Sequence, residues 1–290
     1  MASRPNNYYV PQPNFWPIVG CFGLFTLFVG AAHWLHYMWY GPYVFFLGFS
    51  IVVLMMCGWF GTVIHENKQG LFSEQSDRSF RWGMTWFIVS EVFFFACFFG
   101  ALFFSRLWVV PQLAGEVEPI THIILWPDFI ADWPLLFNPD NSKFEGAHAV
   151  SNTWGIPALN TLILLSSGVS ITVAHWALQK QRRCLLIAAL TVTVLLGITF
   201  LICQGKEYYD AYTVDGLTLN AGIFGSLFFI LTGFHGAHVT IGSIILIVIL
   251  GRCIVGHFSP DNHFAFQAAA WYWHFVDVVW LFLFIFVYWL

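Results

Sequence analysis

Long apolar stretches constrain this sequence more than any other feature. Each reaches at least the 20 or so residues with which a helix crosses about 30 Å of hydrocarbon. They lie at residues 16–38, 44–64, 83–104, 157–178, 184–203, 222–250 and 268–290. Membrane strands would instead alternate apolar and polar residues over about ten positions. The sequence therefore predicts an all-α membrane protein whose seven transmembrane helices form a single domain.

The composition excludes the main alternative, a water-soluble domain. Only 9% of the 290 residues are charged, and 59% are hydrophobic. A soluble domain carries about 25% charged residues, so this chain cannot cover a surface that faces water. The net charge of −4 and the absence of a basic run also argue against nucleic acid as a partner.

The positively charged residues predict the orientation of the helices. Most of the 11 Lys and Arg residues lie in the N-terminal tail and in the connections that follow the second, fourth and sixth stretches. The exceptions are Arg106, Lys143 and Lys206. Because Lys and Arg accumulate on the cytoplasmic side, we expect a cytoplasmic N-terminus and a C-terminus outside. The polar connection at residues 105–155 is then expected to form an ordered cap on the outer side.

Two acidic residues, Glu91 and Asp277, fall inside the expected helices. An ionisable group in a span is costly and marks a candidate functional site. The phenylalanines at residues 93–95 disfavour a charged Glu91, which could exchange protons, react with a carbodiimide, contact lipid, or hydrogen-bond a histidine as a neutral acid. A rise of 1.5 Å per residue places Glu91 about 12 Å deep, in the middle layers of the membrane with His235 and His238. These two histidines are therefore its expected partners.

The remaining polar residues inside the expected helices allow two interpretations each. His235 and His238 lie one helical turn apart, so they could ligate a metal or form hydrogen bonds between helices. His274 and Asp277, spaced by three residues, could form a local pair or a proton relay. A metal would need further ligands, and the cysteines show no C-x-x-C pair. The sequence therefore favours paired polar groups, with no metal site and no catalytic residue.

Several longer strings carry a resemblance to a known family. They are RWGM (81–84), SEVFFF (90–95), SGVSIT (167–172), EYYDA (207–211), TGFHGAHV (232–239) and AAAWYWHFVDVVW (268–280). Through these strings, the chain resembles subunit III of the haem–copper cytochrome c oxidases from about residue 16 to its end. The last string is the most specific of the set.

The resemblance implies a non-catalytic core subunit, so that the chain is part of an enzyme only within its complex. Haem and copper are then expected on partner subunits, with subunit I in direct contact and subunit II in the same assembly. The complex would oxidise cytochrome c, reduce dioxygen and pump protons. Subunit III would stabilise the catalytic subunit, support proton uptake and hold phospholipid in a cleft between its first two helices and the other five.

Candidate lipid contacts lie at the expected cytoplasmic ends of the second and sixth helices. The first group is Trp59, His65 and Glu66, and the second is Arg252 and His257 in the following loop. An arginine suits phosphate geometry, whereas His65 replaces an arginine that relatives often carry. The alternative is that these are ordinary cytoplasmic-side polar residues that face water.

Other functions remain open from the sequence. Subunit III of a quinol oxidase is a close alternative, although such relatives generally lack the first two helices. A transporter or channel that uses Glu91 and His238 would need broken helices, which the sequence does not indicate. A lipid-binding scaffold is a further possibility. The length of the connection at residues 105–155 favours a bacterial plasma membrane over the mitochondrial inner membrane.

Overall fold

The computed structural model describes residues 9–10 and 13–290. Over this part, seven helices are long and apolar enough to cross a membrane, and no strand forms, as the sequence predicts. They are α1 (Trp16–Leu35), α2 (Gly41–Lys68), α3 (Glu74–Phe104), α6 (Ile156–Gln179), α7 (Arg183–Thr213), α8 (Ile223–Val255) and α9 (Phe264–Leu283). The described chain divides into two compact units, which meet between Trp82 and Gly83 within α3.

The first unit is built around a close hairpin of α1 and α2. Glycines make this approach possible, because a β-carbon at Gly30 would overlap the backbone of Phe45. A β-carbon at Gly48 would in the same way overlap the backbone of Leu27. Small residues at such points let helix backbones come into direct contact in a membrane.

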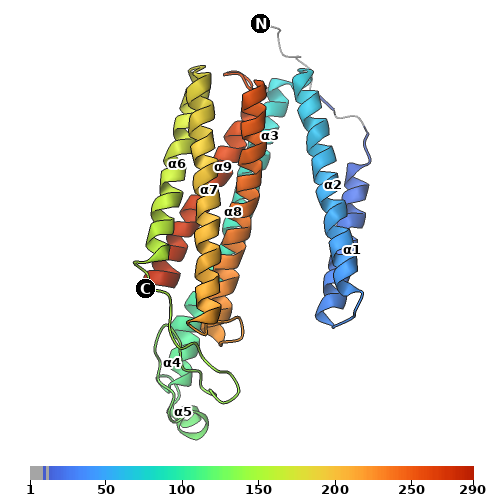
Figure 1. Ribbon diagram of the computed structural model, residues 1–290. Coiled ribbons are helices and arrows are strands. Elements are labelled where there is room, and N and C mark those ends of the chain that lie inside the picture. Colours follow the sequence, from blue (N-terminus) through green and yellow to red (C-terminus); the bar gives the residue numbers. More distant parts are fainter. Residues whose placement is uncertain (1–8, 11–12) are drawn as a thin grey trace. The chain divides into compact units, whose positions relative to one another are not determined.

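The second unit is organised around α9, which packs against α6 and α8 (Figure 1). About 61% of the apolar window of α9 is buried, against 33–39% for the windows of α6, α7 and α8. Trp273 and Trp280 of α9 are almost completely buried. Their indole N–H groups donate to Ser167 and Thr161 of α6, each over 2.9 Å. These tryptophans therefore stabilise the packing of α9 on α6 in two ways, through the burial of their rings and through the hydrogen bonds of their N–H groups.

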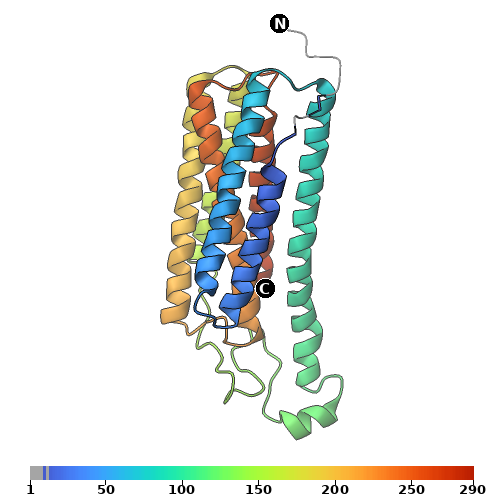
Figure 2. The same cartoon turned by 90° about the vertical axis from the view of Figure 1, so that its right-hand side faces the viewer.

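Helix α3 is longer than the sequence predicted. It begins nine residues before the expected start at Gly83 and continues through a π-helical turn, Ser105–Val109, into α4 (Val110–Leu113). The short helix α5 (Pro119–Leu125) follows (Figure 2). The continuous helix Glu74–Leu113 has 40 residues and so extends about 60 Å, which is more than one hydrocarbon layer. The expected connection at residues 105–155 thus starts as helix.

Helices α7 and α8 also extend past their expected ends. Helix α7 was predicted to stop at residue 203, but it runs to Thr213, because no proline interrupts it and its polar residues still find buried positions. Helix α8 runs to Val255, and Gly256 ends it in the left-handed conformation at φ +83°. Arg252 was expected in the loop and instead lies in the last turn of α8.

Candidate functional site

Glu91 of α3 and His238 of α8 form a direct pair inside the second unit. His238 Nε2 lies 2.9 Å from Glu91 Oε2. The two side chains are 14% and 20% exposed, respectively. Of the two histidine partners that the sequence allowed, the structure selects His238, and the pair links two helices that are far apart in the chain.

The other ring nitrogen of His238 fixes how many protons the pair holds. Nδ1 lies 2.7 Å from the carbonyl oxygen of Phe234, one turn earlier on α8. A carbonyl only accepts, so Nδ1 carries a proton and donates it. One further proton then lies between Nε2 and Oε2, on either the acid or the imidazole. In both arrangements the pair has no net charge, which lowers the cost of holding it within a membrane helix.

Aromatic rings enclose His238 and thereby shield the pair. The centroid of its ring lies 5.1 Å from that of Phe95, 5.9 Å from that of Phe94 and 6.3 Å from that of Tyr272. Phe93 was expected to join this shell, but it is 69% exposed. It points elsewhere because successive residues of a helix are turned by about 100°. The shield comes from α3 and α9 together.

His235 has a separate environment although it is one turn from His238. Its side chain is fully buried, and Nε2 donates to the carbonyl of Val276 on α9 over 3.2 Å. Its ring packs between Phe200 and Trp280. The two histidines therefore serve different helices and do not converge on one metal ion. Across residues 9–10 and 13–290, no three His, Cys, Asp or Glu side chains are grouped so that they could hold a metal ion.

The predicted pair of His274 and Asp277 lies where α9 meets α6. His274 Nδ1 is 3.7 Å from Asp277 Oδ2, an ion-pair distance that is too long for a hydrogen bond. His274 is half-exposed, and its Nε2 lies 3.3 Å from the hydroxyl of Thr172. The Asp277 carboxylate occupies the space over Gly168, where a β-carbon would overlap it. This pair is a helix–helix contact, distinct from Glu91.

The sequence interpretation missed a third buried acid, Glu207. It is only 1% exposed, whereas 20% of the Glu91 side chain is exposed. Because α7 was expected to end at residue 203, Glu207 was assigned to a loop. Its spacing from Phe200, Gln204 and Ala211 does carry a signal, since these positions share one helical face. All four are buried.

The candidate lipid contacts divide between the two units. In the first, Trp59 is 38% exposed, His65 is exposed and Glu66 is half-buried. In the second, His257 is half-buried and Arg252 is 9% exposed. The Arg252 guanidinium lies 4.4 Å from the centre of the Phe258 ring, and its Nε has no hydrogen-bonding partner in the described chain. Arg252 is thus a buried cation rather than a loop residue.

Comparison with known proteins decides the family. The family model "Cytochrome c oxidase subunit III" matches residues 6–136 and 144–290. The chain belongs to the cytochrome c oxidase subunit III family. The unmatched residues 137–143 lie in the long connection between α5 and α6.

Similar proteins match the chain over nearly its whole length. Cytochrome c oxidase subunit 3 of Squalus acanthias is 41% identical over 290 residues, which cover 100% of this chain and 99% of the relative. The protein of the same name from Papio hamadryas is also 41% identical over the same shares. That of Branchiostoma lanceolatum is 42% identical over 287 residues, or 99% of this chain and 97% of the relative. These relatives of the cytochrome c oxidase subunit III family are animal proteins, so they give no support to the bacterial source that the sequence favoured.

Proposed function

We propose that this chain is a non-catalytic core subunit of a proton-pumping cytochrome c oxidase. It contacts subunit I, is assembled with subunit II, and leaves the haem and copper to those partners. The observation that carries this proposal is the match to the subunit III family, which includes both long parts of the chain. The hydrogen bonds of two histidines support it as well. His235 already bonds to the carbonyl of Val276 and His238 to Glu91, so neither Nε2 atom is available as a ligand for haem or copper.

In this proposal, the Glu91–His238 pair holds α3 to α8 and is not an obligatory proton station. This role is supported by the hydrogen bonds of His238, because both of its ring nitrogens, Nδ1 and Nε2, have partners within the chain. The chain stabilises the catalytic subunit and sustains proton uptake from outside the reaction centre. We further propose that the N-terminus faces the cytoplasm or its topological equivalent, because the Lys and Arg residues favour that side.

Gentle purification through a tag on this chain tests the proposed assembly. We expect larger subunits and the optical spectrum of haem to co-purify, because the redox groups lie on partners. After dissociation, elemental analysis of the isolated chain should find no stoichiometric copper, iron or zinc. One metal per isolated chain that is lost in His238→Ala would refute the proposal.

We also propose that phospholipid binds at the end of α8, with Arg252 as the group that meets the phosphate. The buried guanidinium has an unpartnered Nε, and a delocalised cation of this shape pairs well with phosphate oxygens. His257 follows Arg252 in the chain and is a second candidate at this site. In the first unit, the candidate lipid contacts are Trp59, His65 and Glu66.

Native mass spectrometry of the purified complex measures this lipid contact. Arg252→Ala should lower the amount of co-purifying anionic phospholipid. Arg182→Ala is the control, because Arg182 is exposed and its guanidinium lies over the Trp176 ring. If the lipid content of Arg252→Ala equals that of Arg182→Ala, the phosphate is bound elsewhere.

A further inference from the structure

His274 is unusually accessible for an ionisable side chain in the middle of a membrane helix. Its side chain is 45% exposed, whereas those of Glu91, His238 and Asp277 are 20%, 14% and 8% exposed. The span that contains α9 has 26 residues and begins at Phe264, so His274 lies about 15 Å along a helix of about 39 Å. This depth is inside the hydrocarbon, where the exposed part of the ring meets neither water nor a lipid headgroup.

The contacts of His274 within the chain leave its ring only partly satisfied. Thr172 of α6 donates its single hydroxyl hydrogen to the carbonyl of Gly168 over 2.9 Å. In the 3.3 Å contact between that hydroxyl and His274, the ring Nε2 therefore carries the proton and donates it. On the other side of the ring, Nδ1 lies 3.7 Å from Asp277. Both distances exceed the usual range of about 2.7–3.2 Å, so a group from outside the chain can make a shorter bond to the imidazole.

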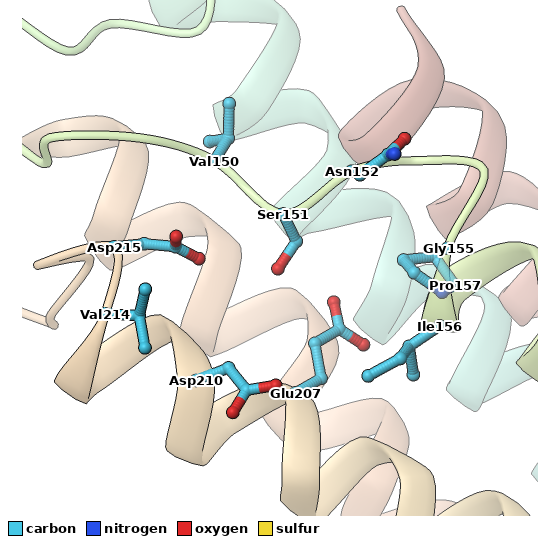
Figure 3. Close-up of a pocket in the computed structure, with 10 residues that line it drawn as sticks. All are labelled: Val150, Ser151, Asn152, Gly155, Ile156, Pro157, Glu207, Asp210, Val214 and Asp215. Carbon is cyan, nitrogen blue, oxygen red and sulfur yellow. The ribbon is translucent and has the colours of Figure 1, made fainter.

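The buried acid at the C-terminal end of α7 has the opposite arrangement. Glu207 lines a cavity of about 440 Å³ there, beside the segment that carries Ser151 (Figure 3). It is only 1% exposed, and the hydroxyl of Tyr288 hydrogen-bonds to it inside the chain. Glu207 is thus served by its own chain, whereas nearly half of the His274 side chain lies on the surface of the helix bundle.

The surface around His274 is a seam between α6 and α9. Apolar side chains border it, with Leu165 (42% exposed) and Val169 (66%) on α6 and Val278 (50%) on α9. Spacings of three and four residues place Val169 beside Thr172 and Val278 beside His274. The α6–α9 seam, formed by these five residues, is therefore an apolar strip with one polar position near the middle of the membrane.

This pattern fits a helix from another chain better than it fits lipid. Acyl chains would pack against the valines but offer the imidazole no hydrogen bond. Ionisable side chains in membrane spans almost always face protein or a water-filled cavity, and polar side chains form hydrogen bonds between membrane helices. A hydroxyl or amide complements the polar position, because it can accept from His274 Nε2 and donate to the hydroxyl oxygen of Thr172.

We propose that the α6–α9 seam is the docking surface for an apolar transmembrane helix of a neighbouring oxidase subunit. That helix presents a Ser, Thr, Asn or Gln side chain to His274 and Thr172. The inference rests on the proposed oxidase role, which supplies the neighbour, and adds the surface and the chemistry through which the neighbour is held.

Site-specific photocross-linking in the intact purified complex tests this docking surface. The photoreactive residue p-benzoylphenylalanine replaces Val278 or Val169, which leaves His274 and Thr172 in place. We expect both positions to cross-link to the same partner subunit. Peptide mass spectrometry should locate the links in one membrane span of that subunit, about one helical turn from a hydroxyl or amide side chain.

Val192 of α7 is the matched control. It is a valine that is 47% exposed, and it lies about 14 Å along α7 from Arg183, at a depth similar to that of His274. The same probe at Val192 should label lipid.

Two substitutions of His274 measure the polar contact itself. His274→Gln keeps a donor and an acceptor and should retain the cross-linked subunit. His274→Leu should lower the amount of that subunit retained per copy of this chain about threefold in detergent, as expected for one hydrogen bond between membrane helices. Equal retention in the two variants would show that this side chain does not hold the partner.

Two cross-linking results would overturn the proposal. One is labelling of lipid alone from Val278 and Val169, at the level found for Val192. The other is a cross-link to a second copy of this chain. The haem spectrum separates these failures from that of the oxidase role, because that role fails only if haem and larger subunits do not co-purify.

Discussion

Replacing Gly30 with leucine should break the α1–α2 hairpin. A β-carbon at this position would overlap backbone atoms of Phe45, so the two helices can accommodate a side chain only by separating. Overpacking in a well-filled contact costs about 1–3 kcal/mol, and a clash with backbone belongs at the upper end of that range. We expect Gly30→Leu to lower the thermal midpoint of the complex, as measured by fluorescence-detected size exclusion, and to expose residues 36–40 to proteolysis.

Gly61→Leu is the matched control on α2. No atom lies within 4 Å of the position where its β-carbon would stand. Its effect should stay within about 0.5 kcal/mol, as for other exposed substitutions. If the two variants have the same thermal midpoint, the close approach of α1 and α2 does not stabilise the first unit.

Glu91→Gln should abolish labelling by an apolar carbodiimide and leave oxygen reduction within about twofold of the unmodified complex. The amide has no acid to react, but its N–H can donate to His238 Nε2, because Nδ1 already donates to Phe234. Labelling is read by mass spectrometry and turnover by oxygen consumption. The prediction does not require that proton pumping or long-term stability be unchanged in this variant.

The comparison with Glu91→Leu isolates the hydrogen bond. Leucine leaves Nε2 of His238 without a partner among aromatic rings, which costs about 1–3 kcal/mol. We expect Glu91→Leu to lower the thermal midpoint and Glu91→Gln to preserve it. A loss of turnover of about 100-fold or more in Glu91→Gln, with the complex assembled and its haems intact, would show that Glu91 is an obligatory proton station.

The sequence was sufficient where one physical rule dominates. Length and hydropathy located the seven helices, because a membrane span must be about 20 residues long and apolar. The position of each residue along its helix also predicted that Glu91 and His238 lie at a similar depth in the membrane. Depth alone cannot say which of His235 and His238 faces α3, since that depends on how α8 is rotated about its axis.

The sequence was misleading where a helix leaves the apolar layer. Gln204 and Glu207 look like the start of a loop when hydropathy alone is considered, yet α7 continues because its backbone hydrogen bonds do not require apolar side chains. The same reasoning placed Arg252 outside α8. In each case helical periodicity continues beyond the point at which the composition changes, and periodicity is the better guide to the end of the helix.

The burial of α9 sets an order of events during synthesis. This helix supplies Trp273 and Trp280, the largest fully buried side chains of the second unit, and it leaves the ribosome after α6, α7 and α8. Until then, Ser167 and Thr161 of α6 have no indole to accept from, and the space beside Gly197 and Gly242 is empty. The helices made before α9 therefore lie in the membrane with this core unfilled until α9 is inserted. A nascent chain that stops before residue 264 lacks both tryptophans, so the core of the second unit can close only after α9 has been made.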